Sequence, residues 1–421
     1  RGLTLASVGV HDLVRDVALR TLQIGRPLDF VAVSDHAEFL GTIYACEHET
    51  DPGYDSELCQ QFRADPENTF FSLNLRLAIG ATYPAICGVD GVDCDEATVA
   101  LWEEIQEAAE AAYDRSDACQ FTSFVGYEWS GSPGTANLHR NVIFRTRDVP
   151  AAPISHFEAP TALELWTRLQ SECREGLPGC DVLAIPHNSN WSNGNLFVPE
   201  TPAGSDPATV AQLRADLEPL LEVYQHKGDS ECMNGISGLG EPDELCDFEK
   251  LRTGEVEDCG DAVGSNGIIA RGCVSRLDFL RGVLLAGLQE EAKLGVNPYR
   301  LGVIASTDTH NGTPGKVEEA SYSGHFGNLE SDPVARLTAA IPAGPRNSGG
   351  GLVAVWAEEN SREAIYAAMR RKETFATSGP RIKVRFFAGY DFPADVMART
   401  DAVRQAYAHG VPMGGDLLPS K

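Results

Sequence analysis

Five apolar runs in the sequence end in an acid or a histidine, the residue types that bind divalent metals and transfer protons. The runs are FVAVSDH, FVGYE, VLAIPH, LEVYQH and GVIASTDTH, and the candidate metal ligands at their ends are His36, Glu128, His187, His226, Asp308 and His310. In parallel β/α folds the carboxyl ends of the strands meet at one mouth, so side chains from distant positions become neighbours there. We therefore expect a site for two or more divalent cations. The mixture of imidazoles and carboxylates favours Zn, Mn or Fe over Ca or Mg.

Local spacing assigns roles to these side chains. In an extended chain Asp308 and His310 point to the same side, as two ligands of one metal require. The neighbours Asp35 and His36 point to opposite sides, so we take His36 as the ligand and Asp35 as an acceptor behind it or a cap. Glu128 is the natural bridging carboxylate, because it can offer one oxygen to each of two cations.

Other polar residues beside the same runs suit substrate binding and proton transfer. Arg140 begins the run RNVIFR, and its guanidinium could hold an anionic oxygen with two hydrogen bonds. His139 or Asp35 could protonate a leaving group. Asn188, which follows the run VLAIPH, is expected in the pocket wall, and Lys227 is assigned to substrate binding.

Each motif taken alone also has a purely structural explanation. An Asp-His pair at a strand end can be a capped turn, Tyr-Glu-Trp can be an exposed acid beside a core aromatic, and Arg140 can be a surface cation. His226 is the least specific ligand candidate, because a histidine followed by a lysine is common in charged loops. The recurrence at equivalent positions of five runs favours the metal site over these separate explanations.

The elements that must position these residues follow from the hydrophobic pattern. Short runs rich in Val, Ile and Phe alternate with segments of helical periodicity, which predicts an α/β architecture with a mainly parallel sheet. Strands are expected at 28–34, 121–127, 140–145, 181–186, 220–225, 301–306, 352–357 and 382–388, and helices at 10–23, 97–117, 161–174, 207–216, 275–294 and 361–371. Asp95 and Ser275 are expected N-caps. Eight strands favour a barrel over a small sheet, and without an internal repeat or a linker we expect one domain over 1–421.

Ten of the eleven cysteines form close pairs in loop-like sequence, which predicts disulfides. The pairs are Cys46 with Cys59, Cys87 with Cys94, Cys173 with Cys180, Cys232 with Cys246, and Cys259 with Cys273. The remaining Cys119 is expected to be a buried thiol. The stretches at about 46–96 and 228–272 are interpreted as long, disulfide-stapled loop insertions. Disulfides predict an oxidising compartment, periplasmic or secreted, and reduced cytosolic thiols are the alternative.

Charge and hydropathy limit the partners. The formal net charge of -27 and the pI near 4.7 argue against nucleic acid, because no cluster of basic residues offsets the repulsion of phosphates. No run reaches the roughly 18 to 20 apolar residues of a transmembrane helix. The chain starts at Arg1 rather than Met, which we interpret as processing or truncation, and a removed signal peptide stays an open alternative. Nothing in the residues specifies an oligomeric state.

These motifs together resemble a known group of proteins. SDH, GYEWSG with NLHRNVIF, IPHNSNWSNG, HKGDSE, STDTHNGTPG and TSGPR resemble a bacterial domain family of unknown function within the polymerase and histidinol phosphatase (PHP) superfamily of metal-dependent hydrolases. The resemblance runs from about residue 26 to 417. It implies a distorted (β/α)7-type barrel, a site for up to three metals and phosphoester hydrolysis. It supports as ligands His36, Glu128, His187, Asp308 and His310, together with His226.

One feature departs from that superfamily. Its first strand ends in His-x-His, whereas residues 1–27 contain only His11, in a stretch with helical periodicity. Either that strand lies upstream of Arg1 or it has been lost, and its loss would leave one metal position short of ligands.

The resulting expectation is a metal-dependent hydrolase, a phosphoesterase that attacks a small anionic ester with a metal-bridged hydroxide. Two to three ions of Zn, Mn or Fe would be its cofactors. The alternatives are a metal hydrolase of another ester or amide class, and a degenerate, non-catalytic barrel that acts as a binding protein.

Overall fold

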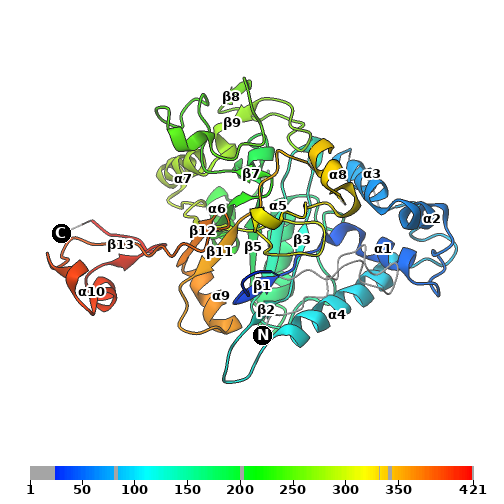
Figure 1. The fold of residues 1–421 in the computed structure, drawn as a ribbon, viewed down its shortest axis with the longest axis horizontal. Coiled ribbons are helices and arrows are strands. Elements are labelled where there is room, and N and C mark those ends of the chain that lie inside the picture. The colour runs from blue at the N-terminus through cyan, green and yellow to red at the C-terminus, as the bar shows by residue number, and fades with distance from the viewer. Residues whose placement is uncertain (1–23, 80–83, 200–202, 331, 340–343, 420–421) are drawn as a thin grey trace.

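The computed structural model describes residues 24–79, 84–199, 203–330, 332–339 and 344–419. The helix expected at 10–23, which includes His11, lies outside these residues. Figure 1 shows most of the strands at the centre of the molecule, with α1, α2, α3 and α4 on one side of them, while β8, β9 and β13 lie at the periphery. The structure is therefore a mixed α/β fold, as expected.

The central strands are short and mostly coincide with the predicted apolar runs. They are β1 (Phe30–Ala32), β2 (Thr122–Phe124), β3 (Gly126–Trp129), β4 (Arg140–Phe144), β5 (Val182–Pro186), β6 (Leu220–Gln225), β7 (Gly228–Asp229), β10 (Gly302–Ala305), β11 (Leu352–Val355) and β12 (Thr374–Thr377). Shorter pairs lie in the insertion, β8 (Asp258–Gly260) with β9 (Val274–Ser275), and near the C-terminus, β13 (Phe387–Ala388) with β14 (Val411–Pro412). The strand expected at 382–388 is wrong over 382–386, which pairs with no other strand of the described residues.

The pairing of the central strands is mixed rather than mainly parallel. β1 pairs in parallel with β2, and β6 in parallel with β10. By contrast, β3, β4 and β5 form an antiparallel sheet, and β11 pairs antiparallel with β12. The expectation of a mainly parallel sheet is wrong here because residues 130–139, which join β3 to β4, are too few for the crossover that parallel strands need.

Ten α-helices surround the strands in the described part of the chain. They are α1 (Leu40–Glu47), α2 (Glu57–Ala64), α3 (Pro66–Ala78), α4 (Cys94–Ala112), α5 (Ala162–Arg168), α6 (Pro207–Leu217), α7 (Leu280–Leu294), α8 (Pro333–Thr338), α9 (Arg362–Arg370) and α10 (Ala402–His409). The stretch 46–96 is thus not only loop, because α2 and α3 lie within it. Asp93 rather than Asp95 caps α4, since its carboxylate accepts from the Asp95 and Glu96 N–H groups. Ser275 caps a 3₁₀ turn that precedes α7.

One core cluster forms where α5 packs over the antiparallel sheet. Thr161 and Glu164 make a capping box that begins α5, and the helix then buries Leu165 and Trp166. These side chains join Trp129, among others, in a cluster of buried residues. Burial of large aromatic side chains is the main favourable term in such a core, and it fixes the positions of β3 and β4.

All five predicted disulfides are present. The sulfurs of each pair are close because the two cysteines are separated by 7 to 14 positions, which is the local spacing that the sequence suggested. Cys119 is the free cysteine, and it is partly exposed rather than buried as expected. The disulfides indicate an oxidising, extracytoplasmic environment.

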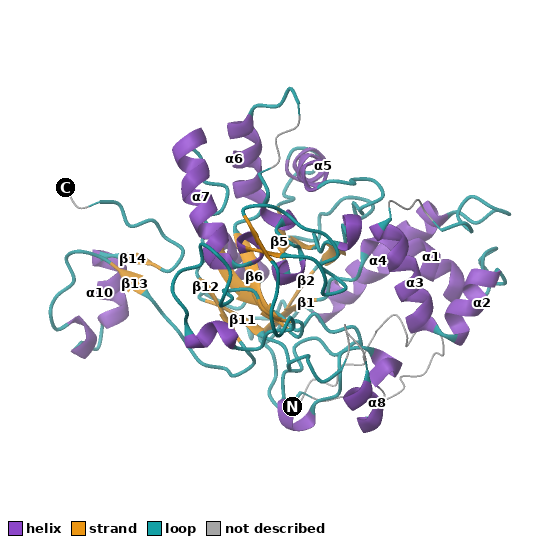
Figure 2. Cartoon of the chain, turned by 90° about the horizontal axis from the view of Figure 1, so that it is seen from above, coloured by secondary structure: helices purple, strands orange, loops and turns teal. Residues whose placement is uncertain are grey.

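The C-terminal elements lie apart from the central strands. Figure 2 shows β13, β14 and α10 at the opposite end of the molecule from α1, α2 and α3. Among the helices of the described residues, none is both long enough and apolar enough to cross a bilayer.

We expect Glu218→Ala to lower the free energy of unfolding by about 3 to 5 kcal/mol, because it leaves buried positive charge without its partner. Glu218 is fully buried and pairs with Arg140 at 2.9 Å and with Arg214 at 3.0 Å. Urea denaturation followed by circular dichroism measures the change. Glu358→Ala is the matched control, since that side chain is 73% exposed and should change stability little. An equal effect of both variants would contradict the prediction.

Thiol titration of the denatured, unreduced protein should detect one free cysteine per chain, Cys119, rather than eleven. After reduction the same titration should reach eleven. A count near eleven without reductant would show that the disulfides do not form.

Candidate metal centre

Parallel strand pairing brings His36 next to Glu128. The register in which Phe30 lies opposite Thr122 is kept further along, where His36 pairs with Glu128 in an isolated parallel bridge. The Glu128 N–H donates to the Asp35 carbonyl oxygen at 2.8 Å. As a result His36 Nδ1 lies 3.3 Å from Glu128 Oε1.

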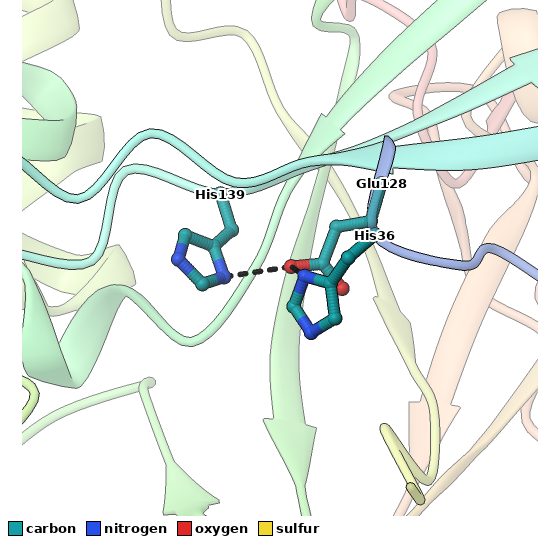
Figure 3. A group of neighbouring side chains, drawn as sticks. All are labelled: His36, Glu128 and His139. Atoms are coloured by element: carbon teal, nitrogen blue, oxygen red, sulfur yellow. Dashed lines mark ion pairs between the residues drawn. The ribbon is translucent and has the colours of Figure 1, made fainter. Parts of the chain in front are cut away.

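Antiparallel pairing brings His139 and His187 to the same carboxylate. Because β4 runs opposite to β3 and β5, its first residue lies beside the ends of both neighbours, and the His187 N–H donates to the His139 carbonyl oxygen at 3.3 Å. His139 Nδ1 is 2.7 Å from Glu128 Oε1, and His187 Nε2 is 3.3 Å from it. Figure 3 shows the side chains of His36, Glu128 and His139 converging from neighbouring strands.

His36, Glu128 and His139 form a group that could hold a metal ion. Their ligand atoms all lie within 4.8 Å of one another. Two imidazoles and a carboxylate are a common donor set for Zn and related ions, and neighbouring ligands of a tetrahedral Zn lie about 3.3 Å apart. The distance from Glu128 Oε1 to His36 Nδ1 is of this size, whereas His139 Nδ1 lies closer, at hydrogen-bond distance. His139, expected as a proton donor to the leaving group, therefore lies within the metal-binding group.

The electrostatics of the group favour a bound cation. Burial alone would raise the pKa of Glu128, but His36, His187 and His139 together hold it well below its usual value. Burial lowers the pKa of His139 to about 4, although Glu128 opposes this shift. For His187 the attraction of Glu128, Asp308 and Glu222 outweighs burial and raises its pKa to about 9. The buried Glu128 anion is thus balanced by a proton on His187, a positive charge that a bound cation would replace.

A second carboxylate, Asp308, lies beside this group. Its Oδ2 accepts from Gln225 Nε2 at 2.6 Å and forms an ion pair with Lys227, while Gln225 Nε2 also lies 3.5 Å from His187 Nδ1. Burial raises the pKa of Asp308, but Lys227 and then His310 lower it more, so the carboxylate stays ionised. Lys227, assigned to substrate binding, here neutralises Asp308.

His310 lies next to His36 at the same site. Its Nε2 lies 3.4 Å from His36 Nε2, and its buried Nδ1 has no hydrogen-bond partner among the described residues. An unpaired buried nitrogen of this kind is a feature that a metal would explain. The argument from an extended chain does not apply, because Asp308 has φ of 50° in the left-handed region. Both side chains nevertheless line one cavity.

His226 contacts His310 and belongs to an imidazole group that adjoins the site. It is fully buried and stacks on His325, with ring centroids 4.3 Å apart, while its centroid is 6.2 Å from that of His310. Burial first, and then Lys227, hold the pKa of His226 well below its usual value. His226 therefore contacts His310 and His325 rather than Glu128.

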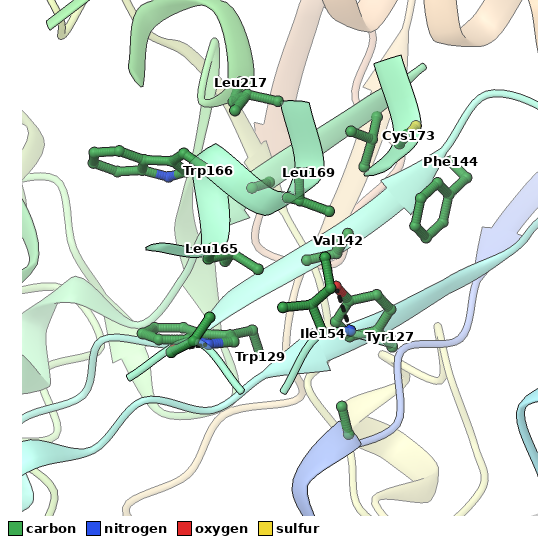
Figure 4. Packing of buried hydrophobic residues seen from close by; sticks show 14 of the residues in the cluster. Tyr127, Trp129, Val142, Phe144, Ile154, Leu165, Trp166, Leu169, Cys173 and Leu217 are labelled. Carbon is green, nitrogen blue, oxygen red and sulfur yellow. Dashed lines mark hydrogen bonds between the residues drawn. The ribbon is translucent and has the colours of Figure 1, made fainter. Parts of the chain in front are cut away.

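Arg140 is buried and is not among the residues that line the cavity, so the geometry gives no support to its predicted role as a clamp for an ester. Neighbours in a strand point to opposite faces, so Arg140 points away when His139 points towards Glu128. Its Nε donates to Glu218 Oε1 at 2.9 Å, and its guanidinium lies near the rings of Trp129 and Trp166. Figure 4 shows both rings within the buried hydrophobic cluster.

Asn188 and Asp35 stay predictions. Asn188 is 1% exposed, adopts φ of 53°, and neither atom of its amide has a hydrogen-bond partner within the described part of the chain. An unpaired buried amide suits contact with a ligand, but Asn188 is not among the residues that line the cavity. Asp35 lines the cavity next to His36.

Several site residues were not predicted from the sequence. Ser130 Oγ lies 2.5 Å from His36 Nδ1, and Ser132 Oγ lies 2.8 Å from His139 Nε2. Both follow Glu128 at two-residue steps in EWSGS, so strand periodicity could have revealed them. His325 follows no apolar run, and nothing local signalled it.

The site opens into a cavity of about 740 Å³. Its lining includes His36, Glu128, His139, Asp308 and His310. This volume is within the range of small-molecule sites, so the metal-binding group has room for a ligand beside it.

We expect Glu128→Gln to reduce the affinity for Zn²⁺ or Mn²⁺ by about 100-fold or more, because the amide lacks the charge of the ligand. Competition with a chromophoric chelator measures the affinity, and circular dichroism checks the fold. Glu358→Gln, on an exposed side chain, is the control and should bind metal like the wild type. Unchanged metal affinity in Glu128→Gln would show that Glu128 is not a metal ligand.

Comparison with known proteins places the chain in a family. Neither the curated proteins nor the solved structures gave a match to it. One family model, described as "Protein of unknown function (DUF3604)", matches residues 12–421, which is nearly the whole length and includes every residue of the site. The chain therefore belongs to the DUF3604 family.

Proposed function

We propose that the protein is a metal-dependent hydrolase, a phosphoesterase that acts on small anionic esters. The observation that carries the proposal is the Glu128 carboxylate, which has His36, His139 and His187 around one oxygen and lies in the lining of a large cavity. A donor set of this kind at a ligand-sized cavity is typical of hydrolytic metal sites.

The side chains divide into those that hold metal and those that serve the substrate. His36, Glu128 and His139 would hold one ion of Zn, Mn or Fe, and His187, Asp308 and His310 would complete a site for two to three. Bound ions of this kind lower the pKa of water and supply hydroxide near neutral pH.

The remaining groups of the cavity favour an anionic substrate. Lys227 lines the cavity and pairs with Asp308, and its ammonium would be free for an anionic group of the substrate once a bound metal ion took over Asp308. Asp35, next to His36 in the cavity lining, is our candidate for donating a proton to the leaving group. Asn188 would orient the ester through its amide.

We also propose that the strands form a distorted (β/α)7-type barrel of the PHP kind. The convergence of strand ends from β3, β5 and β10 and the parallel pairs β1 with β2 and β6 with β10 support it. The disulfides support a periplasmic or secreted location.

Hydrolysis assays test the proposal. With added Mn²⁺ or Zn²⁺ the protein should hydrolyse 4-nitrophenyl phosphate or bis(4-nitrophenyl) phosphate, and a chelator should abolish the activity. Glu128→Gln should lower kcat/KM by about 100-fold or more, since the centre of the metal-binding group is lost. Glu358→Gln should keep wild-type activity.

Two other outcomes would contradict it. Hydrolysis of 4-nitrophenyl acetate or an anilide without hydrolysis of either phosphate would indicate a metal hydrolase of another class. Purified protein with less than about one metal equivalent and no activity on any ester after metal addition would indicate a binding protein.

A further inference from the structure

The insertion that contains Cys259 and Cys273 packs on the loops that follow β3 and β5. We call its residues 264–272 the wall segment. Ile268 N–H donates to the Thr135 carbonyl oxygen at 2.7 Å, and Gly264 N–H donates to the Asn193 carbonyl oxygen at 2.9 Å. These backbone hydrogen bonds join the wall segment to the same loops that carry His139 and His187.

Close approaches of backbone hold the wall segment against Trp191. A Cβ added at Gly267 would lie 1.7 Å from the Trp191 carbonyl oxygen, so only glycine permits this contact. Asn193, which is fully buried with φ of 51°, donates from its amide to the Arg271 carbonyl oxygen at 3.2 Å and accepts from Arg252 at 2.9 Å. The wall segment is therefore held in a fixed position against the loops of the site.

Ile268 and Ile269 of the wall segment line the same cavity as Glu128. Ile269 is 48% exposed, so part of its apolar surface is free to contact a ligand in the cavity. Apolar side chains at the edge of a ligand cavity commonly contact the organic part of the ligand.

Trp191 contributes a hydrogen-bond donor, its indole N–H, beside the wall segment. Its residue is 2% exposed and lines the cavity, and its indole N–H has no hydrogen-bond partner among the described residues. Buried donors are nearly always paired, so this one calls for an acceptor that the described residues do not supply, either a water molecule or an oxygen of a ligand. The Trp191 carbonyl oxygen also accepts from Asn137 N–H at 3.1 Å, which ties Trp191 to the loop that ends in His139.

We propose that Ile268, Ile269 and Trp191 form a subsite for the organic group of the substrate. The group that fits is aromatic or otherwise apolar and carries an oxygen acceptor that the Trp191 N–H reaches. The inference rests on the proposed function, because it concerns the leaving-group side of the same cavity. Ile268 and Ile269 are then residues that determine specificity and take no part in metal binding.

Binding of phosphonates, which the enzyme does not hydrolyse, tests the subsite without relying on activity. Calorimetry on the Zn-loaded protein should give phenylphosphonate an affinity at least tenfold higher than methylphosphonate. In the double variant Ile268→Ala with Ile269→Ala this preference should fall to threefold or less, while methylphosphonate affinity stays within twofold. Ile382→Ala, an isoleucine 64% exposed and absent from the cavity lining, is the matched control and should keep the full preference.

Trp191→Phe separates the hydrogen bond from the apolar contact, because it removes the donor and keeps an aromatic ring. It should weaken 4-nitrophenylphosphonate, whose nitro oxygens can accept, about fivefold and leave phenylphosphonate within twofold.

The remaining outcomes distinguish the two proposals. Equal affinity for phenylphosphonate and methylphosphonate in the wild type, or a preference unchanged in the double variant, would overturn the subsite and leave the phosphoesterase standing. Absence of binding by every phosphonate, together with no hydrolysis of any phosphate, would overturn both.

Discussion

Burial of one carboxylate governs the arrangement of this site. An ionised Glu128 that is 4% exposed is tolerated only because positive or polarisable groups replace the water that it has lost. His36, His139 and His187 supply these groups, each from a different strand connection, and they contact the same oxygen. The register of β1 with β2 and the antiparallel order of β3, β4 and β5 must therefore both be correct before Glu128 is stable as an anion.

Strand β4 shows how the core and the site share one element. Its alternation sends His139 to Glu128 and Arg140 to the opposite face, where Glu218 receives Arg140 and the Trp166 N–H donates to the same oxygen at 2.8 Å. A substitution on one face of β4 therefore shifts the backbone that positions the side chains on its other face. The ion pair under the sheet is thus a structural support for the imidazole that faces the cavity.

Much of the site could be predicted from local sequence. A polar residue at the end of an apolar run identifies His36, Glu128, His187, Asp308 and His310, because the rule needs only the strand boundary. Strand alternation could also have placed Arg140 on the face opposite His139, where it pairs with Glu218, and the same alternation reveals Ser130 and Ser132. The disulfides were predictable because their partners are 7 to 14 positions apart.

The features that local sequence did not predict depend on contacts between distant segments. His325 enters the imidazole group through stacking on His226, and the run 382–388 has a strand-like alternation but pairs only at Phe387–Ala388. The wall segment shows the same limit, since its cysteine spacing predicts a closed loop but not the backbone contact with Trp191. The Cys259–Cys273 disulfide restricts the conformations of this loop. Gly267 and the buried amide of Asn193 then determine where the loop packs. The candidate metal ligands of the cavity thus follow from the ends of strands, whereas the apolar wall that Ile268 and Ile269 form follows from how an insertion packs on the loops after those strands.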